Sequence, residues 1–248
     1  MGVVVSSLEM LARPAWLADT SWNSWPVHRL RYAGTAGAVG QKLGAVLAYP
    51  NVLAVLAVRT FAALLVLAVP LPGFIHAGAL AVVAAGLAVR MLRSPYGGEG
   101  SDQVLLMVVV TLAAVAVDPS PMAMRVGLWF IAAQACLAYL TSGVFKVAAR
   151  VWWDGSALLG VMSTQSWGNP ALAAWLRQRP DVNRWLSRLV GLGEACFPLV
   201  LLAPPPLLPV LLAAGLGFHL VVAAVMGLNC FVWAFAATYP AIAFTATG

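Results

Sequence analysis

The chain has 248 residues, of which 62% are hydrophobic and only 9% are charged, and its formal net charge is +6. Soluble domains carry roughly 25% charged residues, so this composition excludes a soluble globular domain and predicts a polytopic protein of the lipid bilayer. The positive charge does not indicate a nucleic-acid partner, because the basic residues lie near the ends of apolar runs and form no stripe with interleaved aromatic residues.

Residues 1–50 predict an amphipathic segment that lies in the headgroup layer, which tryptophan prefers. Apolar side chains alternate there with polar ones: Leu8, Leu11, Trp16, Trp22 and Trp25. Four glycines follow at a helical spacing that favours close helix packing: Gly34, Gly37, Gly40 and Gly44. Gln41 and Lys42 make residues 33–49 a poor membrane span, although a crossing there stays open. No cleavable signal peptide is expected, because Met1–Val5 lacks a basic region.

Residues 51–248 predict an all-α transmembrane domain, a bundle of six to eight helices. About 20 apolar residues cross a bilayer. Seven runs approach this length: 52–69, 74–89, 104–117, 126–145, 189–203, 207–226 and 230–244. Prolines mark turns between runs at 70–72, 119–121 and 204–206. The last two runs are either two separate spans or one long bent helix pair.

The long connection at 146–188 predicts helices that lie in the interface or re-enter the membrane. Ser156 to Leu176 is amphipathic, and Asn169-Pro170 interrupts it. The connection is also rich in arginine, whereas the turns at 70–73 and 204–206 contain no basic residue. With seven spans, the positive-inside rule places the N-terminus and this connection in the cytoplasm. If residues 33–49 also cross, every later loop changes sides.

Five ionisable residues lie inside apolar runs or at their start: Arg59, Asp102, Lys146, Glu194 and His219. Charged groups in a membrane are costly and usually face the bundle interior in pairs. Glu194 precedes Pro198 by four residues, so its carbonyl loses its helical donor and the backbone beside the carboxyl group is loosened. We predict that Lys146, Glu194 and His219 face one shared cavity and form a catalytic group.

Structural roles for the same residues stay open. Arg59 could pair with Asp102 or Glu194 and only hold helices together. Independently, His219 could be a core histidine whose hydrogen bonds are satisfied within the protein. Lys146 ends a long apolar run, so it either extends to the headgroups as an anchor or acts as a base.

Several common chemistries are absent from the sequence. There is no HExxH motif, and His28, His76 and His219 are too dispersed for an obvious metal cluster, so no metal is predicted. G-G-E-G at 97–100 lacks the GK[ST] of a P-loop and predicts a turn.

The stretch S-G-V-F-K at 142–146, followed by W-W-D-G-S-A-L at 152–158, resembles the signature of the vitamin K-dependent gamma-carboxylases and their bacterial relatives. These proteins share the horizontally transferred transmembrane (HTTM) domain, and their bacterial group includes the sporulation-delaying-protein B family. Further stretches are similar to this domain: G-E-G-S-D-Q at 98–103, Glu194 with Pro198, F-H-L at 218–220, M-G-L at 226–228 and Phe231. The resemblance covers roughly residues 50–246.

The resemblance implies that Lys146 is the catalytic base of a membrane enzyme. It would deprotonate a reduced quinone, menaquinol or a vitamin K-like compound, in order to modify a peptide or small substrate. Glu194 and His219 would orient the substrate or relay protons. The remaining residues of the expected binding set are Trp152, Trp153, Asp154, Arg59 and Asp102. Two details differ from the family: Phe145 replaces the first lysine of a pair, and the spacing from lysine to Asp154-Gly155 is one residue longer.

Two other classes of function stay open. The first is a non-catalytic membrane subunit, similar to sporulation-delaying protein B, that holds a secreted peptide toxin or a soluble partner protein during maturation or export. The second is a small-solute carrier. The composition, rich in Ala, Val, Leu and Arg, is typical of a GC-rich bacterium, so we expect a multi-pass protein of the bacterial cytoplasmic membrane.

Overall fold

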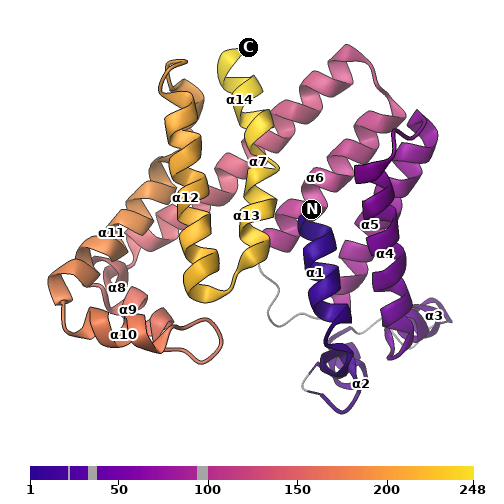
Figure 1. Ribbon diagram of the computed structural model, residues 1–248, viewed down its shortest axis with the longest axis horizontal. Coiled ribbons are helices and arrows are strands. Elements are labelled where there is room, and N and C mark those ends of the chain that lie inside the picture. Colours follow the sequence, from indigo (N-terminus) through magenta and orange to yellow (C-terminus); the bar gives the residue numbers. More distant parts are fainter. Residues whose placement is uncertain (22, 33–37, 94–99) are drawn as a thin grey trace. The chain divides into compact units, whose positions relative to one another are not determined.

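A computed structural model describes residues 1–21, 23–32, 38–93 and 100–248. The chain forms two compact units, Met1–Gly127 and Leu128–Gly248, which are described separately (Figure 1). The sequence interpretations of Trp22, of Gly34 and Gly37, and of the turn at 97–100 fall wholly or mainly outside the described residues.

Within the described residues the chain is helical and contains no strand. Seven helical segments are long and apolar enough to cross a membrane: α4 (Asn51–Ala68), α5 (Gly73–Arg93), α6 (Gly100–Val117), α7 (Pro121–Ala148), α11 (Pro180–Cys196) continued by η4 (Phe197–Leu202), α12 (Leu208–Met226), and α13 (Asn229–Ala236) followed by α14 (Tyr239–Thr247). The prediction of an all-α bundle with six to eight spans is confirmed, and the chain is a multi-pass membrane protein.

The last two apolar runs are separate helices. Gly227 ends α12 with a φ of 74°, a left-handed conformation that glycine adopts without a steric penalty. The fifth span begins at Pro180, nine residues before the predicted boundary. The apolar run begins only after Arg188, whereas the helix already includes Arg184 and Arg188. Its first turns are amphipathic, and only one of their faces is buried.

The N-terminal region consists of short helices: α1 (Gly2–Leu11), η1 (Pro14–Leu17), α2 (Trp25–His28), η2 (Arg29–Arg31) and α3 (Ala38–Leu47). α3 has ten residues and is therefore about 15 Å long, half of the thickness that a span must cross. The described part of residues 33–49 therefore forms no span, which favours the seven-span count.

In the first unit, α1 packs antiparallel along α4. Leu17, Val52 and Leu56 form a buried cluster that Met10 and Leu11 cover. One to two turns further along α4, the buried guanidinium of Arg59 donates hydrogen bonds of 3.0 and 2.6 Å to the hydroxyl of Ser7. On the facing helix α5, Gly86 leaves room for the Arg59 side chain, because a Cβ there would lie 2.7 Å from Arg59 Cδ.

In the second unit, three short helices cover the first turns of α11: α8 (Arg150–Trp153), α9 (Ser156–Met162) and α10 (Pro170–Arg177) (Figure 1). Asn169 caps α10 by accepting a hydrogen bond of 3.0 Å from the Leu172 amide. Met162, Ala173 and Leu176 form the buried core between α9 and α10. The predicted helices of the 146–188 connection and their break at Asn169-Pro170 are confirmed, while their place in the plane of the membrane stays a prediction.

Candidate functional site

The candidate site begins with a close approach of α7 to α11. A Cβ added at Gly143 would overlap the backbone of α11, with Ala195 Cα only 2.5 Å away. A Cβ at Gly191 would lie 3.2 Å from Lys146 Cβ. Glycine at both positions therefore lets the last turns of α7 lie directly against the last turns of α11.

This approach brings Lys146 and Glu194 together across 48 residues of sequence. Lys146 Nζ forms an ion pair with Glu194 Oε2 and donates a hydrogen bond of 2.5 Å to Ser142 Oγ, one turn earlier on α7. The side chains are 18% and 12% exposed, so the pair lies at the edge of the unit. Sequence reasoning missed Ser142, although its spacing of four residues from Lys146 places both on one helix face.

Two tryptophans stand beside Lys146. Lys146 Nζ lies 5.3 Å from the ring centroid of Trp152, a cation–π distance. The Trp153 indole donates to the Val147 carbonyl at 2.5 Å, and Arg188 Nε donates to the Trp153 carbonyl at 2.9 Å. The Arg188 guanidinium also lies 5.7 Å from the Trp153 ring. These contacts hold the indole rings of Trp152 and Trp153 beside the end of α7.

A small pocket opens between these groups. Val147 and Leu192 line it together with Lys146, Trp152, Trp153, Ser187, Arg188 and Gly191. Ser187 and Arg188 were not predicted as site residues. The available signal was the spacing of four residues from Asn183 to Ser187 and on to Gly191, which places small or polar residues on one face of α11. All three residues are buried, whereas the rest of the helix surface near them is more exposed.

Asp154 has a local role in the turn between α8 and α9. Its Oδ1 accepts a hydrogen bond of 2.8 Å from the Ser156 amide, and Gly155 has a φ of 87°. Hydrogen bonds from the Ser156 side chain and backbone lower the pKa of the exposed Asp154 carboxyl group below its usual value. Asp154 does not line the pocket, so its predicted part in substrate binding stays a prediction.

His219 belongs to a second polar cluster, which is buried among aromatic rings. Its Nε2 lies 2.6 Å from the Tyr139 hydroxyl, which in turn lies 3.2 Å from the hydroxyl of Tyr239. The imidazole is 3% exposed and stacks on Phe235 at 4.3 Å. Within the part of the chain that the structure describes, His219 makes no hydrogen bond or ion pair with Lys146 or Glu194. Tyr139 is two helical turns before Lys146 on α7, and it was not predicted.

The remaining predicted site residues, Arg59 and Asp102, lie in the first unit. Arg59 is bound to Ser7, as described above, while Asp102 forms an ion pair with Arg90, including a contact of 2.9 Å between Arg90 Nη1 and Oδ1. These contacts tie helices together. The pairing of Arg59 with Asp102 or Glu194 stays a prediction.

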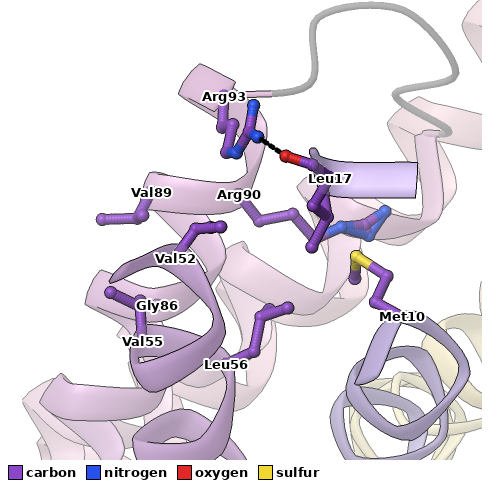
Figure 2. Close-up of a pocket in the computed structure, with 9 residues that line it drawn as sticks. All are labelled: Met10, Leu17, Val52, Val55, Leu56, Gly86, Val89, Arg90 and Arg93. Carbon is purple, nitrogen blue, oxygen red and sulfur yellow. Dashed lines mark hydrogen bonds between the residues drawn. The ribbon is translucent and has the colours of Figure 1, made fainter. Parts of the chain in front are cut away.

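The first unit also contains an apolar pocket, shown in Figure 2, with Arg90 and Arg93 in its lining. Arg93 is buried and donates to the backbone carbonyls of Leu17 and of Asn23, the latter at 2.9 Å. Figure 2 shows the Arg93 guanidinium turned toward the Leu17 carbonyl. Both arginines are thus engaged by protein groups, and Arg93 fastens the N-terminal segment to α5.

In the described parts of both units, no group of three or more His, Cys, Asp or Glu residues could hold a metal ion. No protein-family model matches the chain, and neither a curated protein nor a solved structure matches it. The fold and the site define a multi-pass helical membrane protein with an ion pair and a tryptophan-lined pocket at the end of one span.

Proposed function

We propose that this protein is a membrane-embedded enzyme in which Lys146 removes a proton from a lipid-soluble quinol. The observation that carries the proposal is the Lys146–Glu194 ion pair at the edge of an apolar helix pair, beside a pocket lined by Trp152 and Trp153. Ionisable residues that pair inside a membrane protein often mark proton relays and substrate pathways.

The ion pair can supply a neutral amine. Lys146 Nζ and Glu194 Oε2 are in direct hydrogen-bond contact, and in the proposed step a proton passes from the ammonium to the carboxylate before the substrate is deprotonated. The neutral amine then accepts the proton of a substrate hydroxyl and becomes an ammonium beside the new oxyanion. Glu194 holds the first proton during this step, and the Ser142 hydroxyl keeps Nζ in place.

The side chains around the pocket include groups that can bind a quinol at its mouth, since the cavity itself has room for about one water molecule. Two indole rings offer faces and edges for a flat aromatic ring, and Arg188 supplies positive charge for its oxygen atoms. Leu192 lines the pocket and is exposed. Val144 and Phe145 on α7 and Leu189 on α11 are also exposed, so an isoprenoid tail can lie along this apolar surface. A bound quinol supplies two electrons and two protons to an oxidant such as oxygen.

By the family resemblance, this reaction serves to modify a peptide or small substrate in the bacterial cytoplasmic membrane. The support for this part of the proposal is that the stretches at 142–146 and 152–158 resemble the HTTM domain of the gamma-carboxylases.

The proposal is tested with purified protein in lipid nanodiscs supplied with a short-chain naphthohydroquinone and oxygen. We expect loss of the quinol well above the rate in empty nanodiscs. Glu194→Gln preserves the size of the side chain but removes the proton acceptor, and it should lower the rate about a hundredfold or more. Equal rates with and without protein would contradict the proposal.

A further inference from the structure

The first turns of α11 carry their polar and apolar residues in an inverted arrangement. The buried face of the helix consists of small or polar residues: Asn183, Ser187 and Gly191. The opposite face is apolar and exposed, with side chains at the spacing of one helix face: Val182, Trp185, Leu186 and Leu189. Trp185 is 71% exposed and Leu189 is 66% exposed. A helix on the surface of a soluble protein buries its apolar face instead, so the outer face of α11 suits contact with an apolar phase.

Arginines accompany this apolar face. Residues 170–188 contain four arginines and only one acidic residue, Asp181. Arg177 and Arg179 are exposed, and neither forms an ion pair with a residue that the structure describes. Arg184 pairs with Asp181, whose side chain is itself 81% exposed. The outer surface of α10 and α11 therefore carries positive charge that protein groups do not neutralise.

We propose that this outer surface of α10 and the first turns of α11 binds anionic phospholipids. Phosphate oxygens accept hydrogen bonds from Arg179 and Arg184, while Trp185 lies at the border between headgroups and acyl chains, the layer that tryptophan prefers. The Trp175 ring centroid lies 4.8 Å from the Arg179 guanidinium and orders that arginine beside the headgroups. A cluster of arginines directly before a span attracts acidic headgroups. The proposal is independent of the quinol reaction.

Charge favours a lipid over a second copy of the chain as the molecule that covers this surface. The chain has 14 basic residues and 8 acidic ones, so two copies that met through this same surface would place like charges together. An anionic phospholipid supplies the missing negative charge, and its acyl chains cover the exposed apolar side chains of α11.

A fluorophore beside the arginines measures which lipids gather there. It is attached at Gln178→Cys in a protein without its three native cysteines, and the protein is placed in phosphatidylcholine nanodiscs. Each sample also contains a small share of phosphatidylglycerol or of phosphatidylcholine with a nitroxide quencher near the headgroup end of one acyl chain. A fluorophore at Pro205→Cys is the control position, because the turn at 204–206 contains no basic residue.

We expect labelled phosphatidylglycerol to quench the fluorophore at position 178 several-fold more than labelled phosphatidylcholine does, whereas the two lipids should quench equally at position 205. One arginine near an anionic surface strengthens the attraction by about fivefold. Arg179→Gln combined with Arg184→Gln should therefore bring the ratio at position 178 close to one, and high salt should lower the ratio of the parent protein. Arg125→Gln removes an exposed arginine at the start of α7 and should leave this ratio unchanged.

Three results would overturn the proposal. The first is equal quenching by the two lipids at position 178 of the parent protein. The second is a ratio that survives the loss of both arginines, because the enrichment would then have another cause. The third is weak quenching by both lipids, which would show that the surface stands away from the bilayer, and two chains per nanodisc would then assign it to a contact between copies. Quinol turnover is measured separately, so failure of either proposal leaves the other standing.

Discussion

Gly143 is the residue on which the geometry of the site depends, since any side chain there would meet the backbone of Ala195 and Glu194. We predict that Gly143→Ala pushes α7 and α11 apart, separates Lys146 from Glu194, and lowers the free energy of unfolding by about 1–3 kcal/mol. Thermal unfolding and the quinol assay measure the two effects.

Gly193→Ala is the matched control, because a Cβ at this helical position of α11 meets nothing within 4 Å. Alanine favours a helix over glycine by up to about 1 kcal/mol, so this variant should be neutral or slightly stabilised. Equal melting temperatures for the two alanine variants would show that the helices tolerate a wider separation.

At the scale of elements, the turn between α8 and α9 depends on the charge of Asp154. Hydrogen bonds from Ser156 favour the carboxylate and lower the pKa of Asp154, so the unfolded turn binds a proton more readily than the folded turn. The stabilisation is fully present above the unfolded pKa of about 4 and is lost as pH falls through the lower folded pKa.

We therefore predict that amide exchange at Ser156, corrected for its intrinsic pH dependence, loses protection below about pH 4. Asp154→Asn cannot titrate and should show the same protection throughout this range. The same acid-induced loss in Asp154→Asn would assign the effect to another group.

Element by element, apolar length was enough to predict all seven spans, because a membrane helix needs only a long run of apolar residues. The start of α11 was predicted too late, because exposed arginines in its first turns lower the local hydropathy without interrupting the helix. The Lys146–Glu194 pair depends on how α7 crosses α11, which glycines at 143 and 191 permit but do not specify. Tyr139 was missed because a tyrosine among apolar residues carries no signal until its neighbours in space are known.

For the whole molecule, the seven-span assignment predicts that the two ends of the chain lie on opposite sides of the membrane. The positive-inside rule then predicts that the arginine-rich connection at 146–188 faces the cytoplasm and the turn at 204–206 faces the other side. Single cysteines at Gln178 and Pro205, in a variant without Cys136, Cys196 and Cys230, report this through a membrane-impermeant thiol reagent. Gln178→Cys should react only from the cytoplasmic side and Pro205→Cys only from the opposite side. The reverse pattern would contradict the assignment.

The central claim is that Lys146 acts as a base, and the most direct measurement is the rate of quinol loss with Lys146→Arg. Arginine keeps the positive charge and can pair with Glu194, but it does not deprotonate in proteins. Lys42→Arg is the control, because Lys42 is the only other lysine in the chain. We predict that Lys146→Arg melts near the wild-type temperature yet loses about a hundred- to ten-thousandfold in rate, while Lys42→Arg keeps both. A fully active Lys146→Arg protein would contradict the account and leave Lys146 as a membrane anchor.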